Sequence, residues 1–192
     1  MIRKKEKLES SRCLIRYEAL VRNGSIKLDE AQLSVINRLD TLMALIDSSL
    51  NRNHIIHKDK WIYKLLYKSN VPKKLGFYLY GGVGTGKSML MDIFYNEVLS
   101  KNKLRIHFHS FMQNTHDRIN DARVGGVGDP INTVANEISK SVSVLCFDEF
   151  QITDITDAMI VGRLFSNLIK RGTFIVTTSN RHPNELYKDG LN

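Results

Sequence analysis

Short apolar runs alternate with amphipathic segments along much of this chain. Three runs have the β-branched and aromatic character of buried strands, at residues 75–80 (LGFYLY), 142–147 (VSVLCF) and 173–178 (TFIVTT). Apolar runs of this length are typical of the central strands of a parallel sheet. A fourth strand is predicted over residues 105–109 (RIHFH).

Helices are predicted between these strands, because apolar residues there recur at helical spacing. They are expected over residues 88–99, 111–122 and 152–169, and in a segment that starts at Asp129-Pro130. Proline suits the first position of that last helix, since its missing N–H would have no partner there. Strands that alternate with helices predict an α/β fold with a parallel sheet flanked by helices.

The chain before the first strand is predicted to be helical, over residues 10–22 and 29–50. Asp29 and Gln32 resemble a capping box at the start of the second helix. Three aromatic residues on a short amphipathic segment are expected to pack these helices onto the sheet, or alternatively to contact an adenine base: Trp61, Tyr63 and Tyr67. We predict two parts, an N-terminal helical region over residues 1–74 and a core over residues 75–192.

A glycine-rich loop joins the first strand to the helix after it. Its sequence, GGVGTGKS, satisfies the phosphate-binding pattern G-x-x-x-x-G-K-[ST]. Glycines allow successive N–H groups to point inward at phosphate oxygens, and the helix N-terminus adds its positive dipole end. The alternative is a glycine-rich turn that binds nothing. The residues expected to bind nucleotide are Gly81, Gly82, Val83, Gly84, Thr85, Gly86, Lys87 and Ser88.

Particular roles follow for the last two residues of the loop and for two acids after the strand 142–147. Lys87 is expected to reach the β- and γ-phosphates, and the Ser88 hydroxyl to bind Mg²⁺. Asp148 is predicted to hold the same Mg²⁺ through its water shell, and Glu149 to act as the general base that polarises the attacking water. The alternative for both acids is that they are solvated and cap the following helix.

The chain resembles the ZapE cell-division ATPases of bacteria and their mitochondrial ATPase relatives, a branch of the AAA+ P-loop ATPases. The matching segments are YLYGGVGTGKSMLMDIFY (78–95), RIHFHSFM (105–112), LCFDEFQITDITDAMIVGRLF (145–165) and TTSNRHPNELYKDGLN (177–192). Family members are much longer, so the resemblance implies a sequence that stops before the C-terminal part of the core and the helical lid.

The resemblance implies binding and hydrolysis of ATP with Mg²⁺, and action on a protein partner, such as a division-ring protein or a target of protein quality control. It implies that Asn180, at the tip of the strand 173–178, contacts the γ-phosphate and the water, although asparagine is also common in turns. AAA+ enzymes complete their sites with an arginine from a neighbouring subunit, so nucleotide-dependent self-association is implied. Arg181 is the one arginine after Asn180, and slow hydrolysis by this chain alone is expected.

Composition bears on nucleic-acid binding, on membrane insertion and on the cellular compartment. The net charge is +8, but the basic residues are scattered and form no stripe with interleaved aromatics, which argues against a specific nucleic-acid surface. The sequence has no run of eighteen apolar residues, so no membrane span is predicted. Cys13 and Cys146 do not suggest a disulfide framework, and Cys146, in a predicted buried strand, is expected to be a reduced core thiol. Residence in the bacterial cytoplasm is expected, with mitochondria as the alternative.

Two further alternatives differ in class. One is a nucleic-acid-directed P-loop ATPase such as a helicase loader, which DNA-stimulated turnover would reveal. The other is a nucleotide-dependent binding module that does not hydrolyse. His107 and His109 alternate along the fourth predicted strand, but no third ligand nearby completes a zinc set.

Overall fold

The computed structural model describes residues 11–56 and 75–186, with side chains over residues 11–50 and 75–186. Within them the chain forms two compact units. The first contains α2 (Arg12–Arg22), α3 (Glu30–Ile56) and all but the first residue of α5 (Lys87–Glu97); the second contains the sheet and the later helices. The predicted segment with Trp61, Tyr63 and Tyr67 lies outside the described residues, and the division at residue 74 stays a prediction.

In the first unit, α2 packs against α3. The buried Asp40 carboxylate of α3 accepts hydrogen bonds from the backbone N–H groups of Cys13 (2.9 Å) and Leu14 (3.0 Å). These are N–H groups of the first turn of α2, which have no partner within the helix. Burial raises the pKa of Asp40, so its ionised form depends on these donors.

The predicted cap of α3 is half confirmed. Asp29 Oδ1 accepts the Gln32 backbone N–H at 3.0 Å, as a capping residue should. The backbone N–H of Asp29 donates to the hydroxyl of Tyr17 at 3.1 Å. Gln32 was expected to fill that place in a capping box, but its Oε1 accepts the Tyr17 hydroxyl at 3.2 Å. A buried tyrosine of α2 thus joins the start of α3 to α2.

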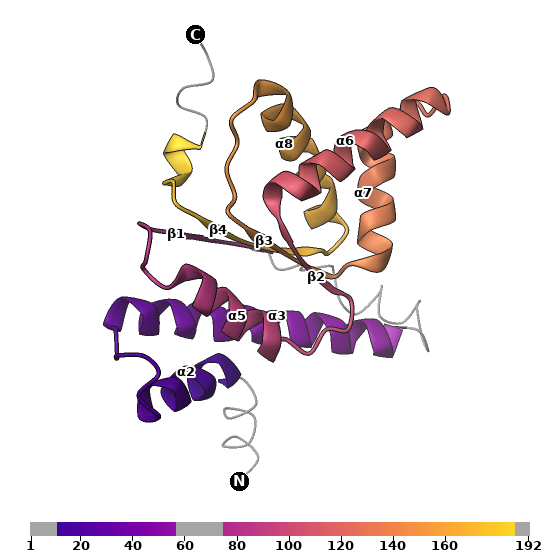
Figure 1. Cartoon of the computed structure of the whole chain (residues 1–192). Helices are drawn as coiled ribbons and strands as arrows, with labels where there is room; N and C mark the ends of the chain where they lie inside the picture. Colours follow the sequence, from indigo (N-terminus) through magenta and orange to yellow (C-terminus); the bar gives the residue numbers. More distant parts are fainter. Residues whose placement is uncertain (1–10, 57–74, 187–192) are drawn as a thin grey trace. The chain divides into compact units, whose positions relative to one another are not determined.

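The second unit is built on a parallel sheet in the order β1-β4-β3-β2 (Figure 1). Its strands are β1 (Gly76–Tyr80), β2 (Lys103–His107), β3 (Val144–Asp148) and β4 (Phe174–Ser179). Every residue of β4 is buried, as are the first four of β3. The two central strands are therefore the most buried ones, as expected for the middle of a parallel sheet.

Three helices lie on one face of this sheet (Figure 1): α6 (Phe108–Val124), α7 (Pro130–Ser141) and α8 (Ile155–Lys170). They enclose the hydrophobic core of the unit, in which Phe147 of β3 stacks on Phe165 of α8 with ring centres 5.4 Å apart. A short 3-10 helix, η1 (Pro183–Glu185), follows β4. Across residues 11–56 and 75–186, no helix has the length and apolar character needed to cross a membrane.

Two predicted boundaries are wrong. The strand expected over residues 105–109 ends at His107, and α6 begins at Phe108, whose ring is buried against Phe147 and Phe150. The helix expected from residue 152 begins at Ile155, because Asp154 accepts the Thr156 backbone N–H at 2.6 Å and caps it. Tertiary packing sets the first of these ends and side-chain capping sets the second. The pattern of apolar and polar residues along the sequence reveals neither.

Candidate active site

The topology places the predicted site residues of the second unit at one edge of the sheet. Because all four strands are parallel, their carboxyl ends meet there. Gly81 follows β1, Asn180 follows β4, and Asp148 ends β3 with Glu149 after it. The Gly81 N–H donates to the Ser179 carbonyl at 3.3 Å, so the glycine-rich loop starts beside the strand that carries Asn180. Open α/β sheets bind ligands at this edge.

The glycine-rich loop has the backbone that a phosphate cradle needs. Gly84 and Gly86 have φ angles of 80° and 85°, in the left-handed region that favours glycine. A Cβ on Gly81 would lie 3.2 Å from Thr85 Oγ1, a tight contact that a side chain at position 81 could make only if Thr85 shifted slightly. Val83 is 89% exposed at the tip of the loop. Alternating left-handed residues turn backbone N–H groups toward a common centre, which is how such loops bind anions.

Lys87 folds back over its own loop. Its Nζ donates to the carbonyl of Gly81 at 2.8 Å and to that of Gly82 at 2.6 Å. These two contacts hold the ammonium group at the mouth of the loop, at the first residue of α5. An ammonium group beside a glycine-rich loop at a helix N-terminus fits the charge of a polyphosphate. Ser88 follows directly as the second residue of α5.

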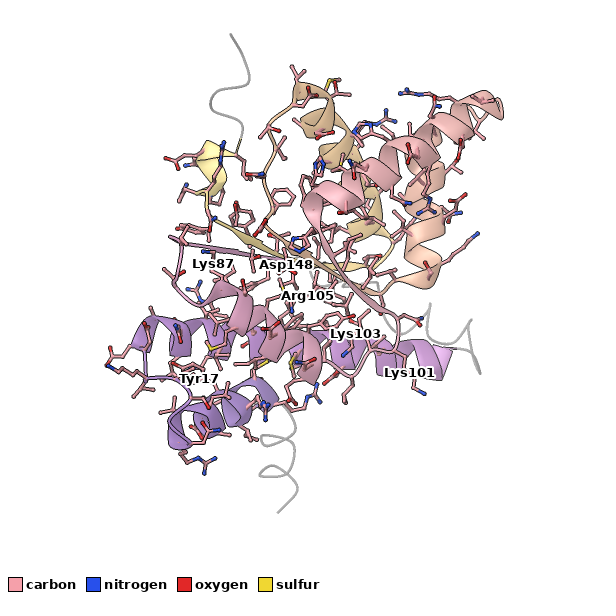
Figure 2. All side chains as sticks on the ribbon, viewed as in Figure 1. Tyr17, Lys87, Lys101, Lys103, Arg105 and Asp148 are labelled. Atoms are coloured by element: carbon pink, nitrogen blue, oxygen red, sulfur yellow. The ribbon has the colours of Figure 1, made fainter. Side chains whose placement is uncertain are left out.

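Asp148 is bound by a residue that the sequence did not single out. Arg105 of β2 forms a two-pronged ion pair with it, Nε to Oδ2 at 2.7 Å and Nη2 to Oδ1 at 3.1 Å (Figure 2). Both side chains are largely shielded from solvent, with exposures of 22% and 15%. A charged residue inside the strand-like stretch RIHFH was the available signal.

Glu149 is exposed and has a backbone φ of 55°. Among residues 11–56 and 75–186 it is the one non-glycine residue with a positive φ. Buried aromatic residues flank the acidic pair, since Phe147 lies before Asp148 and Phe150 directly after Glu149. Such backbone strain persists where the surroundings determine it and is concentrated at functional sites.

Hydrogen bonds from the end of β4 hold Glu149 in this conformation. The Glu149 N–H donates to Thr178 Oγ1 at 3.3 Å, and the Phe150 N–H donates to the Thr178 carbonyl at 2.7 Å. The Ser179 hydroxyl donates to the Phe150 carbonyl at 2.6 Å and accepts the Arg181 N–H at 3.1 Å. The ends of β3 and β4 are thereby joined beyond their last ladder pair. The polar end of β4, TTSN, was the available signal, but only Asn180 was singled out.

The Asp148 carboxylate at this edge is a hard oxygen ligand of the kind that Mg²⁺ prefers. Mg²⁺ is usually bound by one or two carboxylates together with substrate phosphates, rather than by protein ligands alone. In the described part of the chain, no group of three or more His, Cys, Asp or Glu side chains could hold a metal ion. His107 ends β2 whereas His109 lies in the first turn of α6, so the two do not share a strand face as predicted.

Comparison with known proteins gives a family and a fold. A family model described as AFG1-like ATPase matches residues 12–192. Lactation elevated protein 1 homolog B of Danio rerio is 35% identical over 94% of this chain and 44% of its own length. Cell division protein ZapE of Escherichia coli K12 is 37% identical over 91% of this chain and 47% of its own length. The chain thus spans about half the length of these relatives.

A solved structure supports the fold independently. The crystal structure of DnaI aligns with a TM-score of 0.51 at 17% identity, over 86% of this chain and 74% of that one. At this identity the likeness concerns the fold alone. It agrees with the parallel sheet and flanking helices of the second unit.

Proposed function

Since the chain belongs to the AFG1-like ATPase family, we propose that it binds ATP at the loop 81–88 and that the carboxylates after β3 serve hydrolysis. One observation carries the proposal. The loop with two left-handed glycines and a lysine over its mouth starts at the same sheet edge at which Asp148 and Glu149 lie. A strand, a glycine-rich loop and a helix in this order form a phosphate site.

Each residue has one task in this proposal. Backbone N–H groups of the loop bind phosphate oxygens, and Lys87 exchanges its carbonyl partners for the β- and γ-phosphates. Mg²⁺, when bound, neutralises charge on those phosphates. Ser88 and Asp148 are the residues proposed to hold it, Asp148 through water. Glu149 accepts a proton from the attacking water, and Asn180 orients that water.

The role of the whole protein is proposed from the relatives. The Escherichia coli relative is named for cell division, and 37% identity to it supports a role in that process. Action on a protein partner, in cell division or in protein quality control, is part of the proposal. The chain covers about half of that relative, so turnover and partner choice are to be measured on an assembly that hydrolyses ATP. Nucleotide binding can be tested on the 192 residues alone.

Calorimetry with Mg-ATP on wild type and Lys87→Ala is the first test. The variant removes charge-assisted hydrogen bonds worth about 1.5–3 kcal/mol each, so binding should weaken by roughly tenfold or more. Lys140→Ala is the matched control, because this lysine is exposed on α7. Equal affinity of wild type and Lys87→Ala would contradict nucleotide binding at this loop.

A further inference from the structure

The register of β2 and β3 brings Arg105 to Asp148, the residue predicted as a metal ligand. The register aligns Arg105 with Cys146 and His107 with Asp148. Because side chains alternate along a strand, Arg105, Cys146 and Asp148 belong to one face of the sheet. The long arginine side chain therefore reaches diagonally to the carboxylate two residues further along the neighbouring strand. Diagonal pairs of this kind are within reach of long side chains.

The geometry of the pair engages the whole carboxylate. Two nitrogen atoms of one guanidinium meet both oxygens of Asp148. Such a fork fixes the plane of the carboxylate as well as its position. It also gives the pair a net charge of zero, at 22% and 15% side-chain exposure, where solvent screens the charges incompletely.

From this arrangement we propose that Arg105 is a positioning residue that makes metal uptake depend on nucleotide. A carboxylate already neutralised by arginine attracts a divalent cation weakly. Among the described residues, no group of three or more His, Cys, Asp or Glu side chains could hold the ion in its place. The phosphates of a nucleotide supply the missing negative charge. Asp148 then contributes an oriented oxygen to a cation that arrives with them. The inference rests on the proposed function.

Manganese titration tests the charge effect directly. Mn²⁺ replaces Mg²⁺ as the probe, and the loss of its free EPR signal measures binding to the 192-residue chain, first without nucleotide and then with saturating ADP. In the second titration, the Mn²⁺ bound by ADP alone is measured without protein and subtracted. Arg105→Met removes the charge and keeps most of the apolar stem. Without nucleotide it should bind Mn²⁺ roughly tenfold more tightly than wild type, because one positive charge beside a divalent cation is removed. With ADP the gain should be under roughly threefold, since the phosphates dominate the charge of the site.

Matched variants separate charge from shape. Arg105→Lys keeps the charge but lacks the fork, and should stay within roughly threefold of wild type without nucleotide. Arg118→Met removes the same charge from the pair that Arg118 forms with Glu137 of α7, and should change nothing. In an Asp148→Asn background, Arg105→Met should lose its effect, because the carboxylate through which it acts is absent. If Arg105→Met fails to fold by circular dichroism, Arg105→Gln removes the charge and retains an amide donor.

The outcomes distinguish this inference from the proposed function. If wild type binds ADP and the neutral Arg105 variants bind Mn²⁺ no more tightly than wild type, the positioning role is overturned and nucleotide binding stands. A tenfold gain that persists with Asp148→Asn also overturns it. If wild type binds neither ADP nor Mn²⁺ with ADP, the proposed function and this inference are both overturned.

Discussion

Asp148 and Glu149 are adjacent in sequence, yet their surroundings differ in a way that suits two roles. Asp148 is mostly shielded and held on both oxygens by Arg105. Glu149 is exposed, and its backbone is held through Thr178 and Phe150. A carboxylate that is fixed and charge-compensated suits a ligand, whereas one that projects from a fixed backbone suits proton transfer.

These surroundings predict different effects for the two isosteric substitutions, Asp148→Asn and Glu149→Gln. Asp148→Asn should weaken Mg-dependent ATP binding, because it removes a charged oxygen from the metal site. Glu149→Gln should leave binding intact and slow hydrolysis by roughly 10²-fold or more, since only the base is lost. Equilibrium binding with and without Mg²⁺ and single-turnover hydrolysis in an active assembly measure the two effects. Hydrolysis by Glu149→Gln at the wild-type rate would show that another group is the base.

At the scale of elements, the connected ends of β3 and β4 position the residues that we propose for the chemistry. The ladder between these strands ends at the pair Phe147–Thr177. Beyond it, the hydroxyl and carbonyl of Thr178 contact the two residues after Asp148. The end of β4, which Asn180 follows, is therefore bonded directly to the backbone of Glu149.

Two neighbouring threonines provide a controlled test of this connection. Thr178→Val removes the acceptor of the Glu149 N–H and should destabilise the fold by about 1 kcal/mol and slow hydrolysis, with ATP affinity unchanged. Thr177→Val is the control, because Thr177 Oγ1 is buried and has no hydrogen-bond partner within the described residues. It should be neutral or stabilising. Urea unfolding and single-turnover rates measure both, and equal rates for the two variants would argue against a positioning role for Thr178.

The sequence predicted what is local and missed what depends on strand neighbours. The strand–loop–helix around Gly81–Ser88 and the buried strand before Asp148 are contiguous, so their patterns are visible in one stretch. The Arg105–Asp148 pair joins residues 43 positions apart. It depends on β2 pairing with β3 and on the register of that pairing, neither of which hydrophobic periodicity specifies.

At the scale of the whole molecule, each compact unit carries one buried cysteine. Cys13 of α2 and Cys146 of β3 are both 0% exposed. Burial raises the pKa of Cys146 to about 12 and raises that of Cys13 as well. Because the thiolate is the reactive form, both cysteines should be inert while their unit is folded.

Thiol labelling should therefore report opening of the units separately. In single-cysteine variants, Cys13→Ala and Cys146→Ala, the remaining thiol should react with DTNB at pH 8 far more slowly than N-acetylcysteine, and at a comparable rate in urea. Mg-ATP at 100 times its Kd should slow labelling of Cys146 by up to roughly 100-fold, if opening releases the nucleotide. Rapid labelling of either thiol in native buffer would contradict the burial described above.

The left-handed backbone at Glu149 affects which substitutions selection would favour at this position. A non-glycine residue in that conformation costs roughly 1 kcal/mol, and glycine or asparagine would relieve much of it. Selection for heat resistance alone should thus enrich Gly or Asn at position 149. Such variants should melt at a higher temperature than the parent protein and should not hydrolyse ATP. Selection for turnover should restore glutamate at the expense of melting temperature. Under the proposed role of Glu149 as the general base, position 149 is where stability and activity compete.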